Sequence, residues 1–349
     1  MPVAPPWSRH PLLTRGLAWA VLAAVAACAQ PDQAGLLTGG RAYPPDPPTG
    51  EATRLMAADL DPGVTRLRLG ITPYTQESRE RRDLAPLVAH VSEALGIPVE
   101  LVSSGSYGEL VAAITEERVD VALLSPVSYV QARAIQPALH LAARAISQGS
   151  PEYSSYIIVR RDDPAHTLAD LRGRRMAWVD RLSGSGYLYP RHVLRQAGLD
   201  PERMFASAQF YGTHEAAMAA LLRGEVDAAA VASGALALPC KAGEAQTARG
   251  FRVLHKCGKL PYDALAVRAG MGREALKKIT WVFQGLNNRT EYGRKVLADT
   301  WAISGWMPAD ESVYEGVRAH LEAMAPARAA GFSGAATLTD LPLEASHVE

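Results

Sequence analysis

The feature that most restricts the fold is a regular alternation of short apolar runs and amphipathic segments in the body of the chain. Residues 67–71, 99–102 and 119–124 have the composition of strands, and residues 83–95 and 107–116 carry apolar side chains at helical spacing. Strands and helices that alternate at this spacing predict an α/β fold with a mainly parallel sheet.

The same pattern starts again near residue 153. Strands are expected at 156–160, 175–179, 208–211, 226–231, 251–254 and 264–267, with helices at 168–173, 185–197 and 214–223. Helices are expected to dominate from 273 to about 323. Two similar α/β units predict a cleft between them, and clefts at such interfaces hold ligands.

Composition narrows the class of protein. The chain has 349 residues, 48% hydrophobic and 21% charged, which is ordinary globular usage and suggests about two domains. Lys+Arg and Asp+Glu both number 36, so no bulk charge favours nucleic acid. Three cysteines are too few for a disulfide-rich scaffold or a four-cysteine zinc site.

The N-terminus resembles an export signal. Arg9 and Arg15 precede an apolar run, Leu17–Ala27, that ends at Cys28. The last residues of this segment are similar to a bacterial lipobox, so residues 1–27 are interpreted as a lipoprotein signal peptide and Cys28 as the lipidation site. The alternative is an anchor helix that merely ends in cysteine. The body is then expected on the periplasmic side of the bacterial envelope, attached to the membrane by lipid.

Two segments are not expected to fold. Residues 28–65 are rich in proline and have no periodicity, which predicts an extended linker. Residues 326–349 belong to an Ala/Gly/Ser-rich stretch and are expected to be a poorly ordered tail.

Three stretches carry more specific motifs. They are Val119-Asp-Val-Ala-Leu-Leu-Ser-Pro-Val-Ser-Tyr-Val130, Asp180-Arg-Leu-Ser-Gly-Ser-Gly-Tyr-Leu-Tyr-Pro190, and Tyr211-Gly-Thr-His-Glu215 followed by Gly224-Glu-Val-Asp-Ala-Ala-Ala-Val231. In order and separation they resemble the phosphate/phosphite/phosphonate-binding proteins of ABC transporters, over roughly residues 66–320.

The resemblance implies a two-lobed type II periplasmic binding protein, with a hinge and an interlobe cleft that closes over the ligand. One lobe would comprise residues 66–155 plus 259–325, and the other residues 156–258. It further implies a monomer that binds a small oxyanion and delivers it to an ABC permease.

The second motif supplies a candidate anion site. Ser183, Gly184 and Ser185 follow a predicted strand and open a predicted helix, where free N–H groups and hydroxyls suit an oxyanion. The alternative is an ordinary serine cap with glycine turn chemistry. With the family resemblance, all three residues are predicted to bind ligand.

Four further residues are candidate ligand contacts. Ser125 opens a helix and has the same capping alternative, and Tyr129 lies one turn later, where core packing is an equal alternative. Tyr74 follows the first strand, at the sheet edge where ligands sit in open α/β sheets. For His214 the resemblance implies contact with the oxyanion, through a protonated or donor tautomer; the alternative is an ordinary helix-start residue.

Two departures from the family bear on the ligand. The family commonly has threonine where this chain has Gly184, and often carries an acid near residues 231–234, where this chain has none. Such an acid would suit the ammonium of an aminophosphonate. Its absence favours phosphate, phosphite or a small phosphonate.

Cys240 and Cys257 are interpreted mainly as a disulfide closing a 17-residue loop. The alternatives are two unpaired thiols, or a thiol pair that binds a soft species such as arsenite.

The leading hypothesis is an oxyanion-binding lipoprotein of an ABC transporter. The alternative is a receptor for arsenite, arsenate or a phosphorus oxyanion that signals to a membrane histidine kinase. No Walker loop or His-Glu-x-x-His cluster is present, so we expect no enzyme, no catalytic residue, no cofactor and no metal site.

Overall fold

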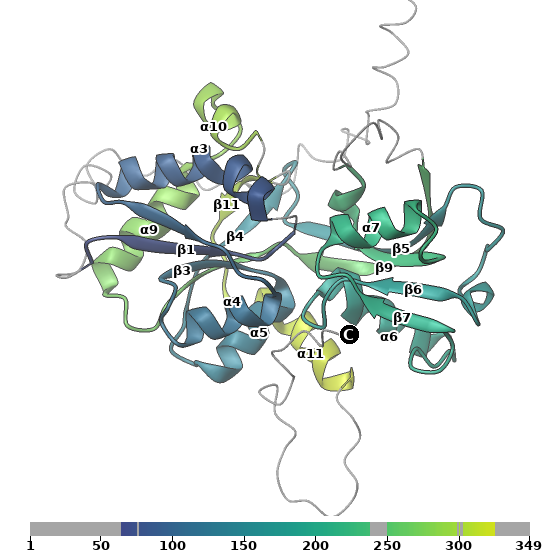
Figure 1. Ribbon diagram of the computed structural model, residues 1–349. Helices are drawn as coiled ribbons and strands as arrows, with labels where there is room; N and C mark the ends of the chain where they lie inside the picture. Colours follow the sequence, from purple (N-terminus) through teal and green to yellow (C-terminus); the bar gives the residue numbers. More distant parts are fainter. Residues whose placement is uncertain (1–63, 75–76, 238–249, 299, 301–302, 325–349) are drawn as a thin grey trace, which may run out of the picture. The chain divides into compact units, whose positions relative to one another are not determined.

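The computed structural model describes residues 64–74, 77–237, 250–298, 300 and 303–324 (Figure 1). The segments outside these ranges include the predicted signal peptide, Cys28, nearly all of the linker, Cys240 and the C-terminal tail. Those predictions therefore stay predictions. Within the described ranges, no helix combines the length and apolar character needed to cross a membrane.

One sheet has six strands in the order β11-β4-β10-β3-β1-β2 (Figure 1). In that order the strands are Ile303–Met307, His140–Ser147, Ala264–Val267, Val121–Leu124, Leu67–Ile71 and Val99–Val102. β1 pairs in parallel with β2 and β3, whereas β10 is antiparallel to β3 and β4, and β11 is antiparallel to β4.

Helices cover both faces of this sheet (Figure 1). The covering helices are α3 (Glu77–Leu95) and α9 (Arg273–Gly285) on one face, and α4 (Tyr107–Thr115) and α5 (Pro126–Ile135) on the other. In β3, Val121 and Leu123 belong to the core with α3 and α9, whereas Ala122 and Leu124 belong to the core with α4 and α5. Because both faces of β3 are buried, its sequence is a continuous apolar run.

The second sheet has five strands in the order β7-β6-β8-β5-β9. In that order they are Ser207–Phe210, Arg175–Trp178, Ala228–Ala232, Glu152–Arg160 and Phe251–Pro261. β6 pairs in parallel with β7 and β8, and β5 is antiparallel to β8 and β9. The associated helices are η1 (Leu168–Leu171), η2 (Gly184–Leu188), α6 (Tyr189–Gln196), α7 (His214–Leu222) and η3 (Ser233–Ala237).

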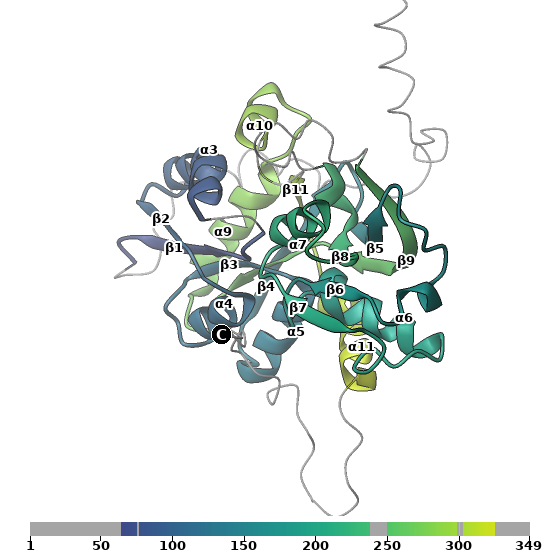
Figure 2. The ribbon, with the colours of Figure 1, turned by 45° about the vertical axis from the view of Figure 1, so that its right-hand side comes forward.

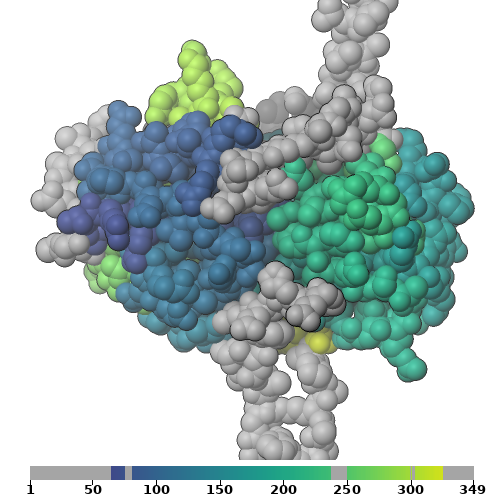
Figure 3. All heavy atoms as spheres, in the orientation of Figure 1, coloured from purple at the N-terminus to yellow at the C-terminus, as the bar shows by residue number. Residues whose placement is uncertain are grey.

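The C-terminal helices complete the described fold. α10 (Glu291–Val296) stands out from the surface in Figure 3, and its Tyr292 is 52% exposed. After η4 (Glu311–Tyr314), α11 (Glu315–Met324) packs against α5, which covers the first sheet, and α6, which belongs to the second (Figure 2). We call each sheet with its associated helices one half of the molecule, so α11 contacts elements of both halves.

Both sheets are mixed, so the expectation of a mainly parallel sheet is wrong. The reason lies in the connections, because the chain passes between the sheets without a helical crossover after β4 and again after β9. Strands joined in this way enter their sheets antiparallel to the βαβ strands. The strands β4 and β11 were not expected, since each pairs only with strands that are distant in the sequence.

The strands β5 and β9 pair along their whole length. Each adjoins one of the two direct connections between the sheets, which we call crossings: the first leads from β4 into β5, and the second from β9 into β10. The register of β5 and β9 shifts between Ser155, which pairs with Gly258, and Tyr156, which pairs with Lys256, so Cys257 is the extra residue of a bulge. The predicted lobe boundaries, at 155/156 and 258/259, fall at this bulge. The second crossing consists of Tyr262 and Asp263, which places Asp263 between the two sheets.

Candidate ligand-binding site

The loop after β6 carries two of the predicted serines into buried positions. Ser183 and Ser185 are 2% and 1% exposed. The Ser183 hydroxyl accepts a hydrogen bond from the N–H of Gly186 at 3.0 Å, and the Ser185 carbonyl accepts one from the Ser155 hydroxyl at 2.9 Å. Ser183 therefore caps the π-helical turn η2, as the capping alternative proposed, and Ser185 lies inside that turn.

Gly184 lets this turn approach β9 and α5 closely. A Cβ atom at residue 184 would lie 2.4 Å from Leu260 Cδ2 and 3.4 Å from Val127 Cγ2. The side chain of Leu260 thus fills the space that a threonine here would need. The resemblance leads one to expect a threonine at this position. This chain lacks that hydroxyl and has an apolar contact between η2, β9 and α5 in its place.

Two tyrosines that the sequence analysis did not single out lie beside these serines. Tyr107 begins α4 and is 1% exposed, and its hydroxyl lies toward Ser183 without a hydrogen-bond partner of ordinary geometry among the described residues. Tyr153 in β5 lies toward Ser185. Burial raises the pKa of both phenols well above the usual value, so both hydroxyls stay protonated and can donate.

His214 starts α7, where Thr213 caps the helix. The ring is 3% exposed, and its Nδ1 accepts a hydrogen bond from the N–H of Ala232 at 3.3 Å. Burial lowers the pKa of His214 to about 4, so the imidazole is neutral near pH 7. Because Nδ1 accepts, the proton lies on Nε2, and His214 is a neutral hydrogen-bond donor.

Tyr74 and Asp263 adjoin these donors. The Tyr74 hydroxyl donates a hydrogen bond to Asp263 Oδ2. The Tyr74 ring stacks on His214, with centroids 6.2 Å apart, and meets Tyr107 edge-on at 6.4 Å. Asp263 is 6% exposed, and burial raises the pKa of its carboxyl to about 7, although the hydrogen bond from Tyr74 opposes this rise.

We call these residues the polar cluster. Its members are Tyr74, Tyr107, Tyr153, Ser183, Ser185, His214 and Asp263. They come from β1–α3 and β2–α4 of the first half, from the loop after β6 and the start of α7 in the second half, and from the crossing segments. Six of the seven carry a hydroxyl or imidazole donor, and of these the Tyr74 hydroxyl already donates to Asp263; the remaining donors lie beside one another, which suits an oxyanion.

Asp180 holds two parts of the cluster together. It is 8% exposed, its Oδ1 accepts a hydrogen bond from the N–H of Leu182 at 2.7 Å, and it also accepts one from the N–H of Tyr107. Burial raises the pKa of this carboxyl. Asp180 therefore ties the first residue of α4 to the serine loop of the other sheet.

Two predicted ligand contacts lie apart from the donors. The Ser125 hydroxyl caps α5 by accepting from the N–H of Ser128, donates to the carbonyl of Leu182 (3.0 Å) and lies 2.9 Å from Ser128 Oγ. Tyr129 is fully buried, with its hydroxyl on Glu311 Oε1 at 2.6 Å and its ring 4.8 Å from that of Tyr314. Ser125 thus lies at the border of the serine loop, and Tyr129 lies in the core.

Among the described residues Cys257 is a free, buried cysteine, and burial raises the pKa of its thiol to about 12. Cys240 lies outside the described residues, so the predicted disulfide stays a prediction. No group of three His, Cys, Asp or Glu side chains in the described ranges could hold a metal ion.

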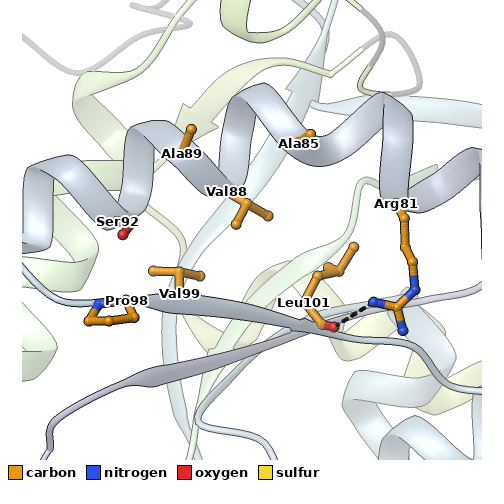
Figure 4. A pocket seen from close by; sticks show the side chains of 8 residues that line it. All are labelled: Arg81, Ala85, Val88, Ala89, Ser92, Pro98, Val99 and Leu101. Carbon is orange, nitrogen blue, oxygen red and sulfur yellow. Dashed lines mark hydrogen bonds between the residues drawn. The ribbon is translucent and has the colours of Figure 1, made fainter.

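A surface groove of about 390 Å³ lies elsewhere, between α3 and the edge strand β2 (Figure 4). Val88 and Val99 point into it, and Arg81 closes one end with a hydrogen bond to the carbonyl of Leu101 at 3.5 Å. The groove is mostly apolar and contains none of the polar-cluster residues.

The signals that could have revealed the missed residues are weak. Tyr107 follows the carboxyl end of β2, the same kind of edge position that singled out Tyr74. Asp263 directly precedes the buried apolar strand β10, where a charged residue is unusual.

Comparison with known proteins relates this chain to a family. The sequence profile of the periplasmic substrate-binding proteins of phosphonate ABC transporters matches residues 69–314. A phosphate-import protein of Mycolicibacterium smegmatis is 29% identical over 171 residues, which are 46% of this chain and 53% of that protein. This chain therefore spans about half the length of that relative.

Two solved structures share the fold. The binding component of a phosphonate ABC transporter from Pseudomonas aeruginosa superposes with a TM-score of 0.67 at 21% identity, over 74% of this chain and 85% of that one. A Prochlorococcus marinus protein in complex with methylphosphonate superposes with a TM-score of 0.66 at 19% identity, over 73% and 97%. The predicted two-lobed periplasmic binding protein fold is thereby confirmed.

Proposed function

This chain belongs to the family of periplasmic substrate-binding proteins of phosphonate ABC transporters, and we propose that it captures phosphate, phosphite or a small phosphonate for an ABC permease. The family is a substrate-binding component of transporters and not a class of enzymes. Among the proteins that match, one is named for phosphate import and another for phosphonate transport.

The observation that carries the proposal is the gathering of donors around Ser183 and Ser185. Tyr107 and Tyr153 lie toward the two serine side chains, and His214 carries a proton on Nε2. These groups are buried and uncharged, and the Tyr107 hydroxyl has no other partner of ordinary geometry in the described part of the chain. Hydrogen bonds from such donors to an anion are stronger than bonds between neutral groups.

The proposal includes the predicted cellular setting. We infer a position on the periplasmic side of the envelope, anchored by lipid at Cys28, from the N-terminal sequence and from the periplasmic family. The monomer is inferred from the resemblance to hinged binding proteins. The role in transport is favoured over the sensor alternative, because the matching profile describes a transporter component.

Calorimetry on the purified chain tests the proposal. The ligands are phosphate, phosphite, methylphosphonate, sulfate, arsenate and arsenite. We expect a micromolar or tighter dissociation constant for one phosphorus oxyanion. Ser185→Ala and His214→Ala should each weaken binding by about ten-fold or more, since each removes a group beside the charged ligand.

Matched controls are Ser92→Ala in α3 and His166→Ala on the surface, which should leave the affinity unchanged. Tight binding of arsenite instead of any phosphorus oxyanion would support the sensor alternative. Absence of binding to every ligand would refute the proposed function and the site together.

A further inference from the structure

The Tyr74 side chain lies between Asp263 and the hydrogen-bond donors of the polar cluster. At one end its hydroxyl donates to Asp263 Oδ2. Along its length its ring lies against His214, nearly parallel at 25°, and against the edge of Tyr107 at 89°. One side chain therefore contacts the carboxylate and two of the groups that we propose hold the oxyanion.

Without Tyr74, Asp263 would be the natural partner for a cationic substituent on the ligand. An ionised carboxylate pairs with an ammonium group, and a buried ammonium is strongly unfavourable unless it is paired. Asp263 lies at the crossing between the sheets and is 6% exposed, and its Oδ2 accepts the hydrogen bond from Tyr74. A cation that pairs with this oxygen must therefore displace the Tyr74 hydroxyl.

We propose that Tyr74 determines specificity: it covers Asp263 and thereby restricts the site to oxyanions without a cationic group. This inference rests on the proposed function, because it takes His214 and Tyr107 as the groups that hold the phosphorus end of the ligand. A site that contains a buried acid would thereby select against aminophosphonates. The acid is already hydrogen-bonded within the protein.

The protonation of Asp263 acts in the same direction. Burial raises the pKa of this carboxyl to about 7, so near neutral pH a large fraction of it is uncharged and attracts a cation weakly. A test that isolates the role of Tyr74 is therefore made at pH 8, where the carboxyl is mostly ionised.

The test compares 2-aminoethylphosphonate with propylphosphonate, which has the same number of heavy atoms and no charge at that end. Methylphosphonate serves as the compact reference, and the full chain is used throughout. We expect the unmodified protein to bind methylphosphonate and to bind both longer ligands at least about ten-fold more weakly. Tyr74→Ala should admit both longer ligands and bind the amino compound about ten-fold more tightly than propylphosphonate.

Two further variants distinguish the effect of the space that the Tyr74 ring occupies from the effect of the Asp263 charge. Tyr74→Ala combined with Asp263→Asn should bind the two longer ligands equally, since the space remains and the charge is gone. Tyr74→Phe keeps the ring and uncovers only the carboxylate oxygen, so the preference for the amino compound should rise less, by about threefold. Tyr292→Phe removes a tyrosine hydrogen bond to His90 on α3, outside the cluster, and should change neither affinity nor preference.

The outcomes distinguish this inference from the proposed function. If the unmodified protein binds methylphosphonate but Tyr74→Ala and Tyr74→Phe show no new preference for the amino compound, the role of Tyr74 is refuted and the function stands. An unmodified protein that already prefers 2-aminoethylphosphonate also refutes it. If the unmodified protein binds no phosphorus oxyanion, the function itself fails.

Discussion

Burial moves the pKa values of the two titratable groups flanking Tyr74 in opposite directions. The carboxyl of Asp263 rises to about 7 and the imidazole of His214 falls to about 4. Between these values both groups are uncharged, so the cluster offers an anion neutral donors without a nearby negative charge. A phosphorus oxyanion meets least repulsion from Asp263 in this range.

The raised pKa of Asp263 has a consequence for stability. A carboxyl whose pKa is higher in the folded than in the unfolded chain favours folding fully below about pH 4, and this contribution is lost as the pH rises through about 7. Asp263→Asn removes this dependence. Between pH 5 and pH 8, its free energy of unfolding relative to the unmodified protein should therefore rise by about 2–3 kcal/mol.

Urea unfolding at pH 5, 6, 7 and 8 measures this difference. Asp162→Asn, at an exposed aspartate, controls for the loss of one charge. Parallel pH profiles for Asp263→Asn and the unmodified protein would contradict the assignment of a raised pKa to Asp263.

Single residues were predictable where a motif surrounded them. Ser183, Ser185 and His214 stand in stretches that resemble a family, and all three lie in the polar cluster. Tyr107 and Tyr153 are ordinary aromatic residues of a helix start and a strand, and only tertiary contacts place them beside the serines. The role of Asp263 depends on a crossing between two sheets that local patterns do not show.

At the scale of elements, the contact between η2 and β9 depends on a residue without a side chain. Gly184→Ala places a Cβ 2.4 Å from Leu260 Cδ2, and such overpacking costs about 1–3 kcal/mol. Leu260 is fully buried, and Leu260→Ala alone should cost about 2–5 kcal/mol. The double variant should lose clearly less than the sum, because each change relieves the other.

Denaturant unfolding of the four proteins gives this coupling energy. Gly316→Ala in α11 is the matched control, since nothing lies within 4 Å of its added Cβ and alanine favours helix. It should be neutral or stabilising. Additive losses for Gly184→Ala and Leu260→Ala would show that the two positions do not compete for space.

Helices and strands were predictable where the spacing of apolar residues within one short stretch indicates them. The strands at 67–71, 99–102 and 264–267 are confirmed with the expected bounds. The helix expected at 185–197 is instead a π-helical turn followed by α6. The serine loop wraps tightly against Val179, directly after β6: a Cβ on Gly186 would lie 2.5 Å from that side chain. β4 and β11 form only through pairing with distant strands, which no local window detects.

At the scale of the whole molecule, the alternation of strands and helices predicted two α/β units, and the resemblance added that they form the lobes of a periplasmic binding protein. Alternation alone led to a mainly parallel sheet, which is wrong because the chain crosses directly between sheets after β4 and β9. These crossings place Tyr153 and Asp263 where the two halves adjoin. The same two crossings therefore account for the mixed sheets and for the presence of Tyr153 and Asp263 in the polar cluster.

Because the polar cluster draws on both halves, a bound oxyanion should stabilise the folded chain as a unit. A ligand that binds only the folded state, at 100 times its dissociation constant, adds about 2.7 kcal/mol and should raise Tm by about 5 °C or more. His214→Ala should lose most of this rise at the same ligand concentration, whereas His166→Ala on the surface should keep it. Thermal unfolding with and without ligand measures the shift. An equal rise in His214→Ala and the unmodified protein would place the ligand outside the polar cluster.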